Sequence, residues 1–166
     1  LYGKNALYDT INKTSKNIFI PLTVGGGIRS VEEIYKILKA GADKVSINSQ
    51  AIKNPKIVEK AIKVFGKSTI VANLEILKIN GEYFCFYNNG RTPAKLKAEY
   101  WIRKLQLLGV GEIIITFIDN DGTGKGFDLE FINKIEKFIT VPLIISGGAG
   151  KIDQINSLFK KTKVSG

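Results

Sequence analysis

Residues 21–38, PLTVGGGIRSVEEIYKIL, decide the fold, because a closely similar stretch, PLIISGGAGKIDQINSLF, occupies residues 142–159. Each stretch combines a short apolar run typical of a strand, a glycine-rich turn and an amphipathic helical pattern. The second copy starts 121 positions after the first. All strand–helix units share some of these features, but the common proline, paired glycines and whole helix in register favour the duplication of a half-barrel. The glycines that coincide are Gly26 with Gly147 and Gly27 with Gly148.

This spacing sets the size of the fold. A repeat of roughly 120 residues, when doubled, gives about the 250 residues of a (β/α)8 barrel. We therefore expect an α/β protein that is an incomplete (β/α)8 TIM barrel with half-barrel internal duplication. The sequence starts at Leu1 and contains no methionine, so we expect a piece of a longer chain. Residues 1–166 would form a single domain, from about the third barrel strand to the start of the eighth.

Short β-branched runs alternate with helical patterns along the whole chain, as in parallel strand–helix units. Two Asn-Gly pairs, at 80–81 and 89–90, predict a hairpin around the aromatic run YFCFY. Ser30 precedes a helical pattern as an N-cap candidate, and another helix is expected to start near Asp128. Strands are expected at 18–24, 44–48, 69–75, 113–118 and 141–146, and a further strand is expected to start at 163. Helices are expected at 5–17 and 152–160. Two more helices are expected to start at about 30 and 128, and two others to end at about 65 and 108.

Composition narrows the functional classes. The 25 Lys and Arg residues exceed the 15 Asp and Glu residues and give a net charge of +10, but they are dispersed, which is typical of a solvated surface rather than a nucleic-acid interface. No apolar run approaches the ~18–20 residues of a membrane span, and no signal peptide is visible. The single cysteine, Cys85, fits a reducing cytoplasm and is interpreted as a packing residue. No histidine is present, which excludes histidine metal sites and Ser-His-Asp triads, and we expect no metal and no cofactor.

Glycine-rich turns between strands and helices are candidate phosphate sites, because glycine lets the backbone approach a phosphate and the helix N-terminus supplies N–H groups. Gly25–Gly27 forms the first such turn, and Asn48 with Ser49 follows the next strand. Gly147–Gly148 repeats the turn in the second copy, and Gly122 starts another one. Each is also compatible with a tight turn that binds nothing. Two related phosphate sites would imply an elongated substrate with a phosphate at each end.

Carboxylates at strand ends are the second signal, because the active sites of barrels lie at the carboxyl ends of their strands. Glu75 ends one strand and is either a general acid or base or a solvated loop residue. Either Asp119 or Asp121, beyond another strand, is a catalytic candidate, although Asp-Gly is also common in turns. Lys44 and Glu112 start their strands, so they either line the opposite opening of the barrel or form an ordinary ion pair.

Four segments together resemble one known family. They are PLTVGGGIRSVEEI, AGADKVSINSQAI, GVGEIIITFIDNDGTGKGFDLEFI and VPLIISGGAGK, and the resemblance extends over essentially all 166 residues. The sequence is similar to the cyclase subunit of imidazole glycerol phosphate synthase, a lyase of histidine biosynthesis. The resemblance implies a (β/α)8 barrel that takes ammonia from a glutaminase partner. It adds that ammonia to a bisphosphorylated substrate, closes the imidazole ring and releases aminoimidazole carboxamide ribotide, without a cofactor.

The same resemblance assigns roles to individual residues. The catalytic carboxylates would be Glu75 and Asp121. One phosphate would be bound by Gly27, Asn48 and Ser49, and the other would lie near Asp121, Gly122 and Gly148. Ammonia would enter through a gate formed by Lys44 and Glu112, and Asp43 would lie at the interface with the partner.

Three departures from the family pattern leave alternatives open. Glu75 stands where the family has an aspartate, and Asn120 stands where it usually has a basic residue. The family's other catalytic aspartate ends the first barrel strand, which this sequence does not include. One alternative is a cyclase-like paralogue that acts with a glutaminase in the amidation of surface-glycan sugars. Another is a non-catalytic scaffold that activates a glutaminase.

Overall fold

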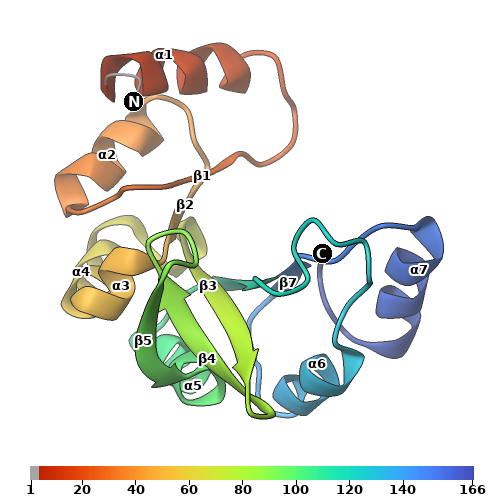
Figure 1. Cartoon of the computed structure of the whole chain (residues 1–166). Coiled ribbons are helices and arrows are strands. Elements are labelled where there is room, and N and C mark those ends of the chain that lie inside the picture. The colour runs from red at the N-terminus through yellow and green to blue at the C-terminus, as the bar shows by residue number, and fades with distance from the viewer. Residues whose placement is uncertain (1–3) are drawn as a thin grey trace.

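Five parallel strands form the main sheet, in the spatial order β1-β2-β3-β6-β7. The computed structural model describes residues 4–166. The sheet curls, and helices surround its outer side (Figure 1). This is the curled sheet of an incomplete (β/α)8 barrel, as expected from the repeat. The strands are β1 Thr23–Gly25, β2 Lys44–Ile47, β3 Ile70–Ile79, β4 Glu82–Tyr87, β5 Thr92–Lys97, β6 Glu112–Phe117 and β7 Leu143–Ser146.

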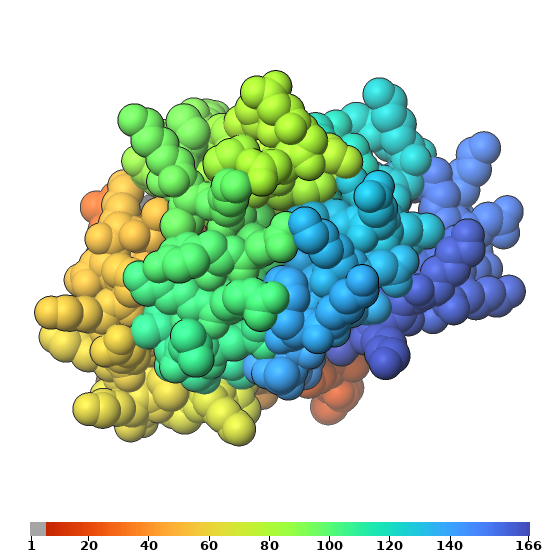
Figure 2. All heavy atoms as spheres, turned by 90° about the horizontal axis from the view of Figure 1, so that it is seen from below, coloured from red at the N-terminus to blue at the C-terminus, as the bar shows by residue number. Residues whose placement is uncertain are grey.

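The helices follow one another around the outside of the sheet. Figure 2 shows α4, α5, α6 and α7 crossing one face of the molecule in chain order, coloured from yellow through green to dark blue. None of the helices in the described part of the chain has the length and apolar composition needed to cross a membrane. The helices are α1 Lys4–Ser15, α2 Val31–Lys39, α3 Ser49–Lys53, α4 Lys56–Phe65, α5 Ala98–Leu108, α6 Leu129–Glu136 and α7 Ile152–Lys161, with a 3-10 turn at Lys67–Thr69.

Side chains alternate between the two faces of the sheet. On β6, Ile113, Ile115 and Phe117 are fully buried in the core between sheet and helices, whereas Ile114 and Thr116 are half-buried on the other face. We call that second face the lumen face, because it is the concave side that a closed barrel would enclose. Glu75 and Asn73 of β3 belong to it, since β3 pairs Asn73 with Ile114 and Glu75 with Thr116.

The hairpin predicted from the two Asn-Gly pairs is present. It is formed by β4 and β5, which run antiparallel to the carboxyl-terminal part of β3. Asn80 and Asn89 both adopt positive φ values, at 51° and 58°, as such turns require. β3 therefore extends beyond the predicted 69–75, because its last residues pair with β4 instead of ending at the barrel rim.

Two other predicted boundaries were wrong. The strand expected at 18–24 contains only Thr23–Gly25, because Pro21 has no N–H for a ladder and Phe19 is 99% exposed. The helix expected to run to Phe65 is two helices, α3 and α4, separated at Asn54-Pro55. The predicted Ser30 cap is confirmed, because its side chain accepts the N–H of Glu33. Asp128, near which a helix start was expected, also caps its helix by accepting the N–H of Phe131.

The chain continues the sheet after α7. The N–H of Ser165 donates to the carbonyl of Leu143 at 2.7 Å, and the N–H of Ile145 donates to the carbonyl of Gly166 at 2.9 Å. These bonds place residues 163–166 beside β7, where the sequence predicts the start of another strand.

Candidate functional site

A cavity of about 440 Å³ lies at the carboxyl ends of β1, β2 and β3. Most of its wall is polar, and it brings together three segments that the sequence analysis singled out separately. These are the glycine turn after β1, the Asn48-Ser49 pair after β2 and the end of β3. Residues that line the cavity include Gly26, Gly27, Asn48, Ser49, Asn73 and Glu75. The structure therefore gathers these separately predicted residues around one cavity.

The glycine turn forms an open wall of this cavity. Gly26 and Gly27 have φ values of 104° and 67°, a region that favours glycine, and a Cβ on either would meet no atom within 4 Å. Helix α2 starts shortly after the turn, so its positive end lies close to the cavity. Ser30 Oγ accepts the N–H of Glu33 there, and Glu33 Oε2 accepts the N–H of Arg29 at 2.7 Å. The turn is suited to an anion.

Asn48 and Glu75 are held together inside the cavity. The Nδ2 group of Asn48 donates to Glu75 Oε2 at 2.9 Å, and the backbone N–H of Gly90 donates to the same oxygen at 2.8 Å. No residue from 4 to 166 donates to Glu75 Oε1. One carboxylate oxygen therefore fixes the side chain, and the other is available to a ligand.

Sequence reasoning missed the basic residues around the cavity. Arg29, Lys53 and Arg91 line it from three different loops or helices, which sequence spacing does not bring together. Lys53 also lies over the ring of Tyr87, with Nζ 4.9 Å from its centroid. With only Glu75 as an opposing carboxylate in the lining, these three cations favour a negatively charged ligand.

The second glycine turn differs from the first. A Cβ on Gly147 would lie 2.6 Å from the carbonyl oxygen of Phe117, and one on Gly148 would lie 2.1 Å from that of Gly126. The N–H of Gly126 also donates to the Gly148 carbonyl at 2.7 Å. These glycines are needed for close backbone packing, whereas Gly26 and Gly27 border open space. The repeat therefore preserves the backbone shape at the two sites but not their surroundings.

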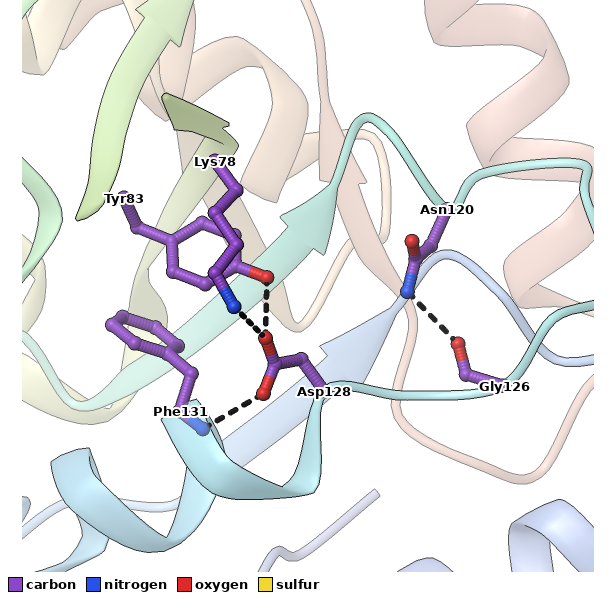
Figure 3. A network of polar contacts seen from close by, with 6 residues as sticks. All are labelled: Lys78, Tyr83, Asn120, Gly126, Asp128 and Phe131. Carbon is purple, nitrogen blue, oxygen red and sulfur yellow. Dashed lines mark hydrogen bonds and ion pairs between the residues drawn. The ribbon is translucent and has the colours of Figure 1, made fainter. Parts of the chain in front are cut away.

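The loop between β6 and α6 carries Asp121 and Gly122, both of them exposed. Asn120 turns back into this loop and donates from Nδ2 to the Gly126 carbonyl at 3.0 Å (Figure 3). Gln154 of α7 supports the loop from the other side, donating to the Gly124 carbonyl at 3.0 Å. The structure does not bring Asp121 into the cavity that contains Glu75.

Asp128 joins the hairpin to α6 (Figure 3). Its Oδ1 atom caps the helix through the N–H of Phe131, while Oδ2 accepts Tyr83 Oη at 2.8 Å and Lys78 Nζ at 3.0 Å. Burial acts to raise the pKa of Asp128, but these hydrogen bonds together outweigh it and lower the pKa below its usual value. Burial, with the bond to Asp128, raises the pKa of Tyr83. We interpret this cluster as structural.

At the amino-terminal end of the strands, Lys44 Nζ lies 2.5 Å from Glu112 Oε2. Glu112 is 8% exposed, and Lys44 is its ion-pair partner. Asp43, beside Lys44, accepts the N–H of Leu22 at 2.8 Å and so fixes the connection into β1. The ion pair predicted from the strand starts is confirmed.

Cys85 is fully buried on β4, as its interpretation as a packing residue requires, and burial raises the pKa of its thiol to about 12. No group of three or more carboxylate or thiol side chains able to hold a metal ion gathers among residues 4–166.

Comparison with known proteins agrees with this geometry. A family model described as "Histidine biosynthesis protein" matches residues 2–166. The chain is 43% identical over 162 residues to the imidazole glycerol phosphate synthase subunit HisF of Clostridium botulinum (strain Kyoto / Type A2), covering 96% of this chain and 64% of that protein. It is 44% identical over 163 residues to the subunit of the same name from Bacillus cereus (strain G9842), covering 98% and 65%. The chain thus spans a little under two thirds of these relatives, and it belongs to the histidine biosynthesis protein family.

Proposed function

We propose that the protein containing this chain is the cyclase subunit of imidazole glycerol phosphate synthase. It would use ammonia from a glutaminase partner to convert a bisphosphorylated substrate into imidazole glycerol phosphate and aminoimidazole carboxamide ribotide. The observation that carries this proposal is the cavity in which Gly26, Gly27 and three basic residues surround the fixed carboxylate of Glu75. The names of the similar proteins support the same reaction.

The cavity suits one phosphate end of such a substrate. Its glycine turn offers backbone space next to the start of α2, and Asn48 and Ser49 extend the polar wall. Arg29, Lys53 and Arg91 add positive charge. The second phosphate would bind near Asp121, Gly122 and Gly148, as the family resemblance implies.

Glu75 would be the proton-transfer group in this cavity. Asn48 and the Gly90 N–H hold Oε2, so Oε1 faces a ligand in a fixed direction. Ring closure requires proton transfers on opposite sides of the substrate, and one carboxylate cannot serve both sides. Asp121, or the aspartate that the family has at the end of its first strand, would supply the other.

The glutaminase would dock at the amino-terminal end of the strands. Asp43, Lys44 and Glu112 lie there, and ammonia would enter past the Lys44–Glu112 pair. Phe19 and Ile20 lie in the connection next to Asp43 and are 99% and 73% exposed. Such large exposed apolar side chains beside a charged rim are typical of a protein interface.

A cyclase-like paralogue of glycan amidation is the second candidate. It is favoured by Glu75 in place of aspartate and by Asn120, whose side chain is committed to its own loop. A paralogue of this kind would keep the glutaminase surface and the anion cavity but act on a sugar.

The decisive experiment supplies the protein with ammonium salt and the bisphosphorylated substrate and measures release of the carboxamide ribotide by chromatography. We expect turnover without any partner and faster glutamine-dependent turnover when the glutaminase is added. If no ribotide is released while the glutaminase is stimulated, the scaffold function is correct. If an aminated sugar forms in the presence of sugar substrates instead, the paralogue is correct.

A further inference from the structure

Asn73 has a side-chain amide without a hydrogen-bond partner. It lies in the middle of β3, and its Oδ1 atom is buried with no donor nearby. No residue from 4 to 166 accepts from its Nδ2 group either. Burying the Oδ1 atom in this state costs free energy, because that oxygen loses its bonds to water and gains none in return. Such a group in a folded protein requires an explanation.

The position of Asn73 provides one. Asn73 lies on the lumen face of β3, two residues before Glu75, and it lines the same cavity. Along β3 it precedes Glu75, so it lies on the side of the Lys44–Glu112 pair and deeper than the glycine turn. A ligand that reaches Glu75 from either end of the lumen comes close to this amide.

Asn48 adds a second unpaired oxygen to the same cavity. Its Nδ2 group is occupied by Glu75 Oε2 and by the Phe86 carbonyl at 3.4 Å, which fixes the orientation of the amide. Its Oδ1 atom is buried and has no donor. Two unpaired amide oxygens therefore occur in one cavity, and they are the only buried side-chain atoms without a partner that the described residues contain.

We propose that Asn73, together with Asn48 Oδ1, binds a neutral ligand group that carries N–H donors, and so positions the reacting part of the substrate next to Glu75. An amide can offer both an acceptor and a donor, and rotation about its Cβ–Cγ bond exchanges them. A neutral partner fits because Asn73 has no charge, in contrast to the basic residues near the glycine turn.

Two sources of this chemistry follow from the proposed function, on which the inference rests. One is ammonia, and the other is the carboxamide of the substrate. Ammonia carries N–H donors and a nitrogen lone pair, and the carboxamide carries N–H donors and a carbonyl oxygen. Either group could therefore bond to the amide of Asn73 and to Asn48 Oδ1. The probes below separate the two sources.

The test uses the side-chain NH₂ signals of Asn73 in the nitrogen-15 NMR spectrum of the protein. The signals are assigned by their loss in Asn73→Leu, or in Asn73→Ser if the leucine variant does not fold. The first probe is ammonium chloride, measured at neutral and at alkaline pH, because uncharged ammonia forms in quantity only at alkaline pH. It is compared with choline chloride, a cation without N–H groups. The second is aminoimidazole carboxamide ribotide, compared with the same ribotide lacking the carboxamide.

A shift with ammonium chloride that grows as the pH is raised, and that choline chloride does not produce, supports the proposal with ammonia as ligand. A shift that does not grow with pH shows binding of the ammonium ion and overturns the neutral-ligand proposal. A shift with the carboxamide ribotide that its truncated analogue does not produce supports it with the carboxamide as ligand. If neither probe produces a specific shift, the proposal is overturned. Because the readout does not need turnover, a protein that is inactive in the ribotide-release assay but responds at Asn73 would disprove the proposed function and keep this inference.

Asn73→Leu gives an independent measurement, since leucine has a similar volume and no polar atom. We expect about a tenfold loss of affinity for the responding probe, as for one or two lost hydrogen bonds. The melting temperature should stay equal or rise, because a buried unpaired oxygen is removed. Ile114→Val, directly opposite on β6, is the matched control and should bind normally. Unchanged affinity in Asn73→Leu would contradict the proposal.

Discussion

The amide of Asn48 holds the carboxylate of Glu75 across two neighbouring strands, with Nδ2 2.9 Å from Oε2. The Gly90 N–H, from the turn between β4 and β5, reaches the same oxygen. The residue that follows β2 and a hairpin turn thus converge on one carboxylate oxygen from within β3. This convergence explains how the hairpin contributes to the site although it lies outside the barrel sheet.

Glu75→Gln should abolish most turnover without disturbing the cavity. Glutamine keeps one carbonyl oxygen, which can still accept from Asn48 and Gly90, but it cannot transfer a proton at neutral pH. We expect kcat to fall by about 10²–10⁴-fold, with the Kd of the bisphosphorylated substrate changed less than about threefold. Steady-state kinetics and calorimetry measure the two quantities.

Glu82→Gln is the control for this change, because Glu82 pairs with Lys97 on the exposed hairpin, away from the cavity. It should leave kcat unchanged. A Glu75→Gln enzyme with near-normal kcat would show that Glu75 positions the substrate but does not transfer protons.

The two glycine turns should respond differently to alanine. At Gly27 a Cβ meets open space, so Gly27→Ala should cost only about 1 kcal/mol of backbone strain and should weaken phosphate binding by entering the cavity. At Gly148 a Cβ would collide with the Gly126 carbonyl, so Gly148→Ala should cost about 3 kcal/mol or more. Urea denaturation and phosphate titration separate these effects. Equal destabilisation by the two variants would contradict the difference seen between the turns.

This difference marks the limit of what the sequence predicted. The repeat in residues 21–38 and 142–159 identified the fold, because strand–turn–helix patterns are local and repeat visibly. It also brought Gly27, Asn48, Ser49 and Glu75 into one site, since parallel strands place their carboxyl ends at one rim. Whether a glycine borders a cavity or a carbonyl depends on a distant loop. No local pattern carries that information.

The residues that were missed show the same principle. Arg91 reaches the cavity only because the hairpin turn folds over the residues that follow β2, where the N–H of Asn88 donates to Ser49 Oγ. Asn73 becomes notable only when its unpaired oxygen is seen. The strand predicted at 18–24 failed for a local reason: its apolar letters indicated a strand, but Phe19 and Ile20 are exposed in the connection before β1. Composition identified them as apolar but not as surface residues.

Cys85 should be inert in the folded protein. It is fully buried, and its pKa of about 12 leaves almost no thiolate at pH 8, although the thiolate is the reactive form. We expect an aromatic disulfide reagent to label it only at the rate of unfolding, with a large acceleration in urea. Val64→Cys, on the exposed side of α4, is the control and should react within seconds to minutes. Rapid labelling of the native Cys85 would show that β4 opens locally.

Asp128 should make the protein sensitive to acid. Its pKa is lower in the folded state than the ordinary value of 3.8, so the folded state favours the charged form. The sign follows from linkage: this contribution is fully present above pH 4 to 5 and is lost as the pH falls through the folded-state pKa.

In Asp128→Asn the helix cap remains, since asparagine is also a good N-cap, but Lys78 loses its charged partner. We expect the variant to unfold about 1 kcal/mol more easily at pH 7, the usual worth of such a hydrogen bond, and the difference from the wild type to shrink as the pH falls through the folded-state pKa. Urea midpoints measured from pH 2 to 7 test this. Asp153→Asn, in the first turn of α7, is the control, and a constant gap between Asp128→Asn and wild type at every pH would show that the charge of Asp128 contributes nothing.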